Sequence, residues 1–188
     1  MTTPAVFLDR DGTLIQEVGY LDRLDRIAFF PWSIDAVRLL NRAGFRVVVV
    51  TNQAGVARGF FDEAFLADAH RHIDDRLRAG HARVDAFYYC PHHPEGRVER
   101  YRVACECRKP KAGMVRAAAE SLGLDLTRSF VVGDRWGDIQ MAHAAGSQGI
   151  LVRTGYGQTE EQSPPEGTRA DLVVDHLMDA VGWILRHR

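Results

Sequence analysis

The 188-residue sequence contains almost no lysine, few cysteines and no long apolar run. Lys109 and Lys111 are the only lysines among its 24 basic residues, a bias that we attribute to genomic composition. A net charge of −1 creates no overall field that would attract nucleic acid or a membrane surface, so neither is an expected partner. Apolar runs such as residues 47–50 are far too short to cross a bilayer.

The remaining composition is typical of a globular protein. Hydrophobic residues make up 46% of the chain and aromatic residues 9%, which suits a single domain over residues 1–188. The sequence passes from Met1 directly into a short apolar segment, without the basic region that opens a secretory signal. We therefore expect one cytoplasmic domain.

Short apolar runs alternate with amphipathic segments, a pattern typical of α/β proteins with a mostly parallel, doubly wound sheet. Ser33 is the expected N-cap of the first helix, and Gly44 the residue that ends it. The strands are expected at residues 5–8, 45–50, 84–89, 130–133, 150–152 and 172–174. The helices are expected at residues 33–43, 62–79, 113–122, 136–145 and 177–185, with loops at 90–107 and 158–167.

Polar residues follow three of these strands where each strand ends. Asp9 and Asp11 come after the first strand, Thr51 after the second, and Asp134 after the fourth. Ligands of doubly wound sheets bind at the carboxyl ends of the strands. A lone Asp-x-Asp pair is more often a turn or a helix cap, but the three strand ends together indicate a catalytic site.

Two nearby carboxylates can perform different steps of phosphoryl transfer. Asp9 can attack phosphorus as a nucleophile, and Asp11 can protonate the departing alcohol and then activate water. A hard cation must lie between Asp9 and the anionic phosphate, and Mg²⁺, which prefers oxygen ligands, is suited to this position. Asp134 and Asp138 supply further acidic groups.

Neutral and cationic donors complete this expected site. Thr51 and the amides of the residues after it can hold phosphoryl oxygens, and Lys109 can balance charge during transfer. Substrate contacts are expected along this segment from Asn52, Gln53 and Ala54.

The three cysteines are grouped with a histidine in one polar loop. Cys90, His92, Cys105 and Cys107 form a Cys₃His set of the kind that holds structural zinc, with His93 as the rival nitrogen ligand. Loop 90–107 has little core of its own, so a zinc ion joining its ends would allow it to fold. Three unconnected thiols are the alternative interpretation.

The zinc loop ends directly before Arg108 and Lys109. An ordered loop would therefore place both cations at the phosphate. Two adjacent cations indicate a substrate with a second anionic group, and Arg108 is suited to gripping a phosphate with two hydrogen bonds. Lys111 is expected to begin a helix and face solvent.

The order of these motifs resembles the haloacid-dehalogenase-like phosphatase superfamily. The matching segments are Phe7-Leu8-Asp9-Arg10-Asp11-Gly12-Thr13-Leu14-Ile15, Thr51-Asn52-Gln53, Lys109-Pro110 and Val132-Gly133-Asp134 with Asp138. The resemblance implies Asp9 as nucleophile, Asp11 as acid and base, and Thr51 and Lys109 as phosphoryl holders. It further implies Mg²⁺ bound by Asp9, the Asp11 carbonyl and Asp134, with Asp138 in support. The backbone of Arg135 is expected near the metal, and we assign no role to its side chain.

Two cysteine-containing segments resemble a narrower family, the D-glycero-D-manno-heptose 1,7-bisphosphate 7-phosphatases. They are Cys90-Pro91-His92-His93-Pro94 and Cys105-Glu106-Cys107-Arg108-Lys109-Pro110. This resemblance implies a pocket lined by Glu17, Val18, Gly19 and Tyr20, with Arg108 at the sugar end or its anomeric phosphate. It also implies a cytoplasmic, monomeric enzyme whose product serves the synthesis of nucleotide-activated heptose.

Several alternatives stay open at this stage. The histidinol-phosphate phosphatases share the zinc loop, and Glu17 could bind the amine of their substrate. A polynucleotide 3′-phosphatase shares the Asp-x-Asp and Thr-Asn-Gln motifs, but the near-neutral charge counts against nucleic acid. A catalytically inactive binding module held by zinc is the remaining alternative. The spacing of the motifs leaves room for only a minimal cap, so we expect an open pocket.

Overall fold

The computed structural model describes residues 2–187, in which six strands form one parallel sheet in the order β3-β2-β1-β4-β5-β6. The chain starts at the sheet centre, builds outward to β3, and then returns to add β4, β5 and β6 on the other side. This is the predicted doubly wound α/β fold. The strands are β1 (Ala5–Leu8), β2 (Arg46–Asn52), β3 (Ala86–Cys90), β4 (Phe130–Gly133), β5 (Gln148–Val152) and β6 (Leu172–Val174).

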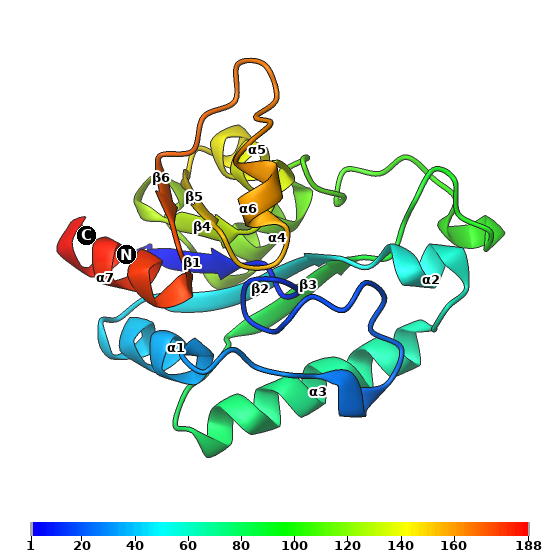
Figure 1. The fold of residues 1–188 in the computed structure, drawn as a ribbon, viewed down its shortest axis with the longest axis horizontal. Helices are drawn as coiled ribbons and strands as arrows, with labels where there is room; N and C mark the ends of the chain where they lie inside the picture. Colours follow the sequence, from blue (N-terminus) through cyan, green and yellow to red (C-terminus); the bar gives the residue numbers. More distant parts are fainter. Residues whose placement is uncertain (1, 188) are drawn as a thin grey trace.

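Helices cover both faces of the sheet (Figure 1). Because side chains alternate along a strand, Val6 and Leu8 pack with α1, α3 and α7, whereas Ala5 and Phe7 pack with α4 and α5. The helices are α1 (Ser33–Arg42), α2 (Ala54–Arg58), α3 (Glu63–Ala79), α4 (Gly113–Leu122), α5 (Trp136–Ala145), α6 (Gly157–Glu160) and α7 (Leu177–His187). Three short 3₁₀ turns are η1 (Leu24–Arg26), η2 (Glu99–Tyr101) and η3 (Leu126–Arg128).

The ends of β2, β3 and β5 lie one or two residues from their expected positions, and three features of the helices also differ from the sequence-based expectation. Ser33 is not the N-cap of α1, a position that Trp32 occupies; its buried hydroxyl donates to the carbonyl of Leu14 at 2.6 Å instead. Helix α2 was not predicted, because five residues are too few to show a helical period. Helix α6 occupies the start of the expected surface loop at 158–167.

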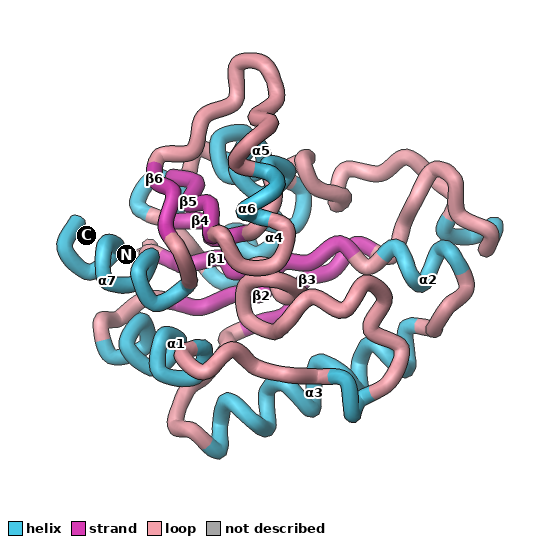
Figure 2. The backbone as a smooth tube through the Cα atoms, viewed as in Figure 1, coloured by secondary structure: helices cyan, strands magenta, loops and turns pink. Residues whose placement is uncertain are grey.

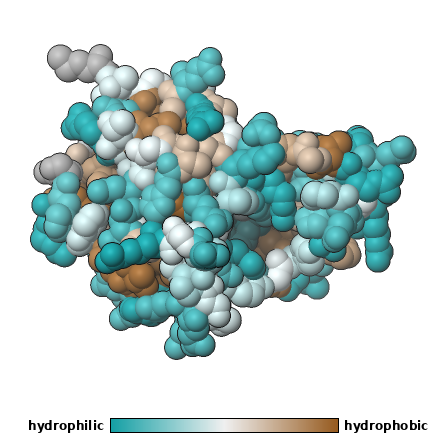
Figure 3. Space-filling model, turned by 90° about the horizontal axis from the view of Figure 1, so that it is seen from above, coloured by the Kyte–Doolittle hydropathy of each residue, from teal (hydrophilic) through white to brown (hydrophobic). Residues whose placement is uncertain are grey.

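The carboxyl ends of the strands lie open. Within residues 2–187, the segment between β1 and α1 contains only η1, and the segment between β3 and α4 contains only η2. This agrees with the minimal cap expected from the sequence. No described helix combines the length and the apolar character needed to cross a membrane. Hydrophilic side chains cover most of the face seen in Figure 3, and the hydrophobic ones form separate patches.

A long, mostly irregular loop connects β3 to α4 (Figure 2). Glu63, the first residue of α3, anchors it: its carboxylate accepts the hydroxyl of Tyr89 at 2.5 Å and that of Tyr101. Both hydrogen bonds lower the pKa of Glu63, and the bond from Tyr101 has the larger effect. The middle of the loop is thereby fixed to the long helix under the sheet.

Candidate active site

A cavity of about 440 Å³ opens at the carboxyl ends of β1 and β2. The strands place Asp9 and Thr51 there because each residue stands at or just after the end of its strand. The lining residues are Asp9, Asp11, Glu17, Gly19, Tyr20, Thr51, Asn52, Gln53, Ala54, Gly55, Arg108, Lys109, Arg135, Gly137, Asp138, Tyr156 and Glu160. Asp9, Asp11, Thr51 and Lys109, the residues that the sequence assigned to catalysis, therefore converge on one site.

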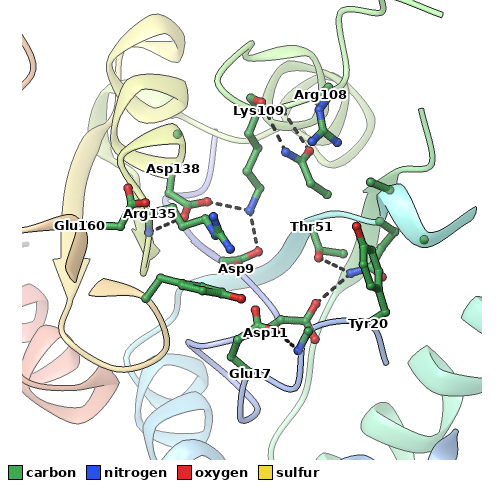
Figure 4. Close-up of a pocket in the computed structure, with 17 residues that line it drawn as sticks. Asp9, Asp11, Glu17, Tyr20, Thr51, Arg108, Lys109, Arg135, Asp138 and Glu160 are labelled. Carbon is green, nitrogen blue, oxygen red and sulfur yellow. Dashed lines mark hydrogen bonds and ion pairs between the residues drawn. The ribbon is translucent and has the colours of Figure 1, made fainter. Parts of the chain in front are cut away.

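Lys109 joins two of the acidic residues. Its Nζ donates to Oδ1 of Asp9 and to Oδ1 of Asp138, both at 2.6 Å, and Figure 4 shows the side chain reaching between them. Burial alone would lower the pKa of Lys109, but the charges of Asp138 and Asp9 raise it overall. The lysine is therefore a fixed, charged donor at the floor of the cavity.

Asp9, Asp134 and Asp138 form a carboxylate cluster, each offering one oxygen within 4.8 Å of the others. Burial is the main cause that raises the pKa of Asp9 to about 7 and that of Asp134 to about 9. For Asp9, Lys109 opposes this shift, while the charges of Asp138 and Asp11 add to it. Repulsion from Asp9 and Asp138 adds to the shift of Asp134. A cation bound among the three carboxylates would offset both their burial and their mutual repulsion.

The partners of the cluster show which oxygens are available. Oδ2 of Asp134 accepts the Tyr156 amide at 2.8 Å, whereas its buried Oδ1 has no hydrogen-bond partner within residues 2–187. Asp138 is engaged at both oxygens, by Lys109 and by the Arg135 amide at 3.2 Å. Mg²⁺ prefers hard oxygen ligands, and the buried Oδ1 of Asp134 is an oxygen that such an ion would satisfy. The cluster therefore fits Mg²⁺. The arrangement agrees with a supporting role for Asp138.

Two glycines let the backbone approach Asp134 closely. Gly12 has φ +83°, and a Cβ there would lie 2.2 Å from Oδ2 of Asp134. A Cβ on Gly155 would lie equally close to the same oxygen. Side chains at either position would displace the carboxylate, so both glycines are required by the site.

Asp11 lies beside the cluster and has different partners. The guanidinium of Arg10 contacts both of its oxygens, and Gln53 Nε2 donates to Oδ2 at 2.9 Å. The same Gln53 nitrogen donates to the hydroxyl of Thr51 at 2.8 Å. The Asp11 carboxylate is therefore not part of the carboxylate cluster. The sequence had predicted a metal contact from the Asp11 carbonyl and an acid and base role for its carboxyl group. The role of Arg10 was not foreseen.

The segment after Asp11 reaches the cavity only in part. Glu17, Gly19 and Tyr20 line it, but Val18 does not: its side chain packs against the hydrophobic core, which corrects the expectation for this residue. Arg26 donates to the carbonyls of Val18 and Tyr20 and so fixes the loop. Burial, followed by the charge of Asp11, raises the pKa of Glu17.

The side chain of Asn52 holds the backbone of Lys109. Its Oδ1 accepts the Lys109 amide at 3.1 Å, and its Nδ2 donates to the Lys109 carbonyl at 3.4 Å. Both the backbone and the side chain of Lys109 are thus held from several elements. Asn52, Gln53 and Ala54 all line the cavity, as the sequence predicted.

One wall of the cavity was missed by the sequence analysis. It contains Arg135, Tyr156 and Glu160, and the Arg135 guanidinium lies 3.8 Å from the centre of the Tyr156 ring. Glu160 accepts the Trp136 amide at 2.9 Å, which ties α6 to the start of α5. The position of Arg135 directly after Asp134 could have indicated that it lies near the site. Tyr156 and Glu160 had no such indication, because they reach the site through the packing of a distant loop.

The Cys₃His set comes together at the base of the long loop. Cys107 Sγ lies 3.1 Å from Cys90 Sγ and 3.3 Å from Cys105 Sγ, and 3.3 Å from His92 Nδ1. Zn–S bonds of about 2.3 Å would place tetrahedral sulfur atoms ~3.8 Å apart. Small outward movements would therefore admit a zinc ion, and the cysteines form no disulfide.

The rival ligand, His93, faces elsewhere. Its Nδ1 accepts the Glu95 amide at 3.1 Å and its Nε2 lies 3.5 Å from Nη2 of Arg58. The four grouped ligand atoms belong to Cys90, His92, Cys105 and Cys107. The adjoining Arg108 donates to the His92 carbonyl at 3.2 Å while it lines the cavity, so the loop and the cavity are directly linked.

Comparison with known proteins agrees with this geometry. A family model of HAD-hydrolase-like proteins matches residues 106–180. The D-glycero-beta-D-manno-heptose-1,7-bisphosphate 7-phosphatase of Escherichia coli K12 is 44% identical over 179 residues, which cover 95% of this chain and 92% of the relative. The protein of the same name from Rhodopseudomonas palustris is 46% identical over 147 residues, covering 78% and 82%.

A solved structure shows the same likeness. The D,D-heptose 1,7-bisphosphate phosphatase from B. bronchiseptica, in complex with magnesium and phosphate, superimposes with a TM-score of 0.86 at 35% identity. The match covers 98% of this chain and 99% of that one. Sequence and fold thus agree over nearly the whole length. The chain belongs to the heptose 1,7-bisphosphate 7-phosphatase family of haloacid-dehalogenase-like hydrolases.

Proposed function

We propose that this protein is a magnesium-dependent phosphatase that removes the 7-phosphate of D-glycero-β-D-manno-heptose 1,7-bisphosphate. The observation that carries the proposal is the position of Asp9, which lines the cavity, belongs to the carboxylate cluster and accepts a hydrogen bond from the buried Lys109 at 2.6 Å. The relatives' names specify the β anomer, and we extend that preference to this chain. They favour this activity over a histidinol-phosphate phosphatase or an inactive binding module.

In the first step, an oxygen of Asp9 attacks the 7-phosphorus while the bond from phosphorus to the sugar oxygen breaks. Asp11 gives its proton to that departing oxygen, so the sugar leaves as a neutral alcohol. Lys109 and Thr51 hold the phosphoryl oxygens with one charged and one neutral donor. The result is an aspartyl phosphate on Asp9 and an ionised Asp11.

In the second step, Asp11 takes a proton from water as the water oxygen attacks phosphorus. The bond to Asp9 breaks, inorganic phosphate leaves, and Asp11 is protonated again for the next cycle. Magnesium, when bound by Asp9, Asp134 and the Asp11 carbonyl with support from Asp138, supplies positive charge between the carboxylates and the phosphate. Asp11 can serve both steps because its carboxylate is not a ligand of the cluster.

Recognition of the second phosphate is assigned to Arg108. Its guanidinium lines the cavity and is fixed to the zinc loop by its bond to the His92 carbonyl. A structural zinc ion held by Cys90, His92, Cys105 and Cys107 would keep the loop, and with it the Arg108 side chain, in place. Glu17, Gly19, Tyr20 and the segment 52–54 would contact the sugar.

The product, heptose 1-phosphate, is a substrate for nucleotidyl transfer, which places the reaction in the synthesis of nucleotide-activated heptose. A single domain, a cytoplasmic location and a monomeric state stay predictions from the sequence and the family resemblance. The domain organisation and the oligomeric state can be checked on the purified chain, and the location by cell fractionation.

The decisive assay measures phosphate release from both anomers of heptose 1,7-bisphosphate and from histidinol phosphate, with and without Mg²⁺. We expect the β anomer to be hydrolysed most efficiently, with loss of turnover when Mg²⁺ is withheld. A preference for histidinol phosphate would reject the proposed substrate. Absence of turnover on every ester would favour the binding module.

A further inference from the structure

Arg10 is almost completely buried, with 1% of its surface exposed, although its side chain carries a permanent charge. It lies between Asp9 and Asp11 in sequence, and its guanidinium does not line the cavity. Burying a charged group is costly unless well-placed partners offset the loss of hydration. The contacts of Arg10 therefore indicate what its burial achieves.

The main partner is Asp11. Nε and Nη2 of Arg10 lie between 2.8 and 3.2 Å from the two carboxylate oxygens of Asp11, with the closest contact from Nη2 to Oδ2. The planar guanidinium thus lies along one edge of the carboxylate, a geometry that restricts its rotation. Gln53 adds a third donor from another element, at 2.9 Å from Oδ2.

The far side of the guanidinium is held by His70 on α3. Nη1 of Arg10 lies 3.4 Å from Nε2 of His70, and the His70 ring stacks on Phe87 with the ring centres 4.8 Å apart. Burial, followed by the charge of Arg10, lowers the pKa of His70 to about 3. A neutral ring can accept a hydrogen bond from Nη1 of Arg10 at Nε2 and so orient the arginine.

We propose that Arg10, oriented by His70, is a positioning residue that aims the Asp11 carboxyl group at the departing oxygen of the substrate. The inference rests on the role proposed for Asp11. Arg10 itself touches neither substrate nor metal. It fixes the carboxyl group, so that its O–H bond breaks in line with the oxygen that is leaving phosphorus, and the proton passes between the two oxygens.

The dependence of rate on the leaving group tests this role. Aryl phosphates such as 2,4-dinitrophenyl phosphate lose a stable anion and need no proton, whereas alkyl phosphates need one. General acid catalysis contributes roughly 10²–10⁴-fold. We expect Arg10→Met to lower kcat/KM for an alkyl phosphate such as the heptose bisphosphate by about 100-fold, and for the dinitrophenyl ester by less than about 5-fold.

The parameter kcat/KM is the right one because it covers only the steps up to departure of the leaving group. Arg10→Lys keeps the charge but loses the planar fork, and we expect an intermediate leaving-group effect. His70→Leu keeps the packing on Phe87 and removes the acceptor; it should show the same selective loss, reduced to about 10-fold on the alkyl ester. Arg71→Met, an exposed change on the same helix, is the control.

Equal losses on both esters in the Arg10 variants would overturn the inference and leave a purely structural ion pair, as would unchanged rates. If Arg10→Met does not fold, Arg10→Lys and His70→Leu decide the question by the same criterion. Wild-type protein that hydrolyses neither ester would reject the proposed phosphatase function itself. The two failures are therefore distinguishable.

Discussion

Lys109 Nζ lies 2.6 Å from Oδ1 of Asp9, although the two residues are 100 positions apart in sequence. Asp9 follows the central strand, whereas Lys109 follows the zinc loop. The contact therefore forms only when the sheet and the loop are both in place. It connects the folding of a peripheral segment to the charge state of the proposed nucleophile.

Asp9→Asn should abolish turnover and leave the fold intact. The amide has the shape of the carboxylate but is a poor nucleophile, so we expect kcat to fall by at least about 10³-fold. Phosphate release and circular dichroism are the measurements. Asp75→Asn, an exposed change on α3, is the matched control and should keep full activity. Turnover comparable to that of the wild type would contradict the assignment of Asp9 as the nucleophile.

The magnesium-free protein should lose stability as the pH rises from 6 to 9. Folding raises the pKa of Asp9 to about 7 and of Asp134 to about 9, from 3.8 in both cases. The folded state then binds more protons than the unfolded state in this window, so the free energy of unfolding falls with increasing pH. Both carboxyl groups must ionise against burial and mutual repulsion.

Thermal unfolding of zinc-loaded protein in magnesium-free buffer measures this trend, and added Mg²⁺ should restore stability most at pH 9. Chelators are avoided because they would also remove zinc. Asp134→Asn should flatten the profile, since it removes the group with the larger shift. A stability that rises between pH 6 and 9 would contradict the prediction.

The purified protein should contain about one equivalent of zinc per chain. His92→Gln removes one of four ligands, so we expect zinc content to fall at least about 10-fold and the melting temperature to drop. His93→Gln is a neighbouring histidine change outside the cluster and should retain the metal. Elemental analysis and thiol titration are the measurements. Zinc-free wild type with freely reactive thiols would refute the site.

Arg108→Met should affect the bisphosphate selectively. Loss of a charge-assisted hydrogen bond removes about 1.5–3 kcal/mol, so kcat/KM for the heptose bisphosphate should fall about 10–150-fold. A monophosphate such as histidinol phosphate should lose little, because it has no second phosphate. Arg102→Met, an exposed change in the same loop, serves as the control. Equal losses on both substrates would place Arg108 at the reacting phosphate instead.

The sequence predicted most of the sheet and the residues at its strand ends. Asp9 and Thr51 could be placed because a parallel strand fixes where its carboxyl end lies, and the motif after each strand is local. Helices α4 and α5 were predicted with their observed bounds, α4 from the regular spacing of its apolar residues. The candidate zinc ligands could be grouped because two short segments contain all of them.

What the sequence could not predict depends on contacts between distant segments. Tyr156 and Glu160 reach the cavity because the loop after β5 packs on Asp134 and on the start of α5. Val18 turned toward the core because its loop is fixed by Arg26, a contact without a local pattern. The Arg10 side chain depends on His70, sixty residues away.

The carboxylate cluster has a consequence for the order in which ligands bind. In the fully ionised state that a metal ion binds, the carboxylates of Asp9, Asp134 and Asp138 and the ammonium group of Lys109 sum to a formal charge of −2. One divalent cation cancels this charge. An anionic phosphate that arrived first would be repelled, so productive encounters follow metal loading, and the free concentration of Mg²⁺ sets the fraction of chains able to accept the sugar phosphate.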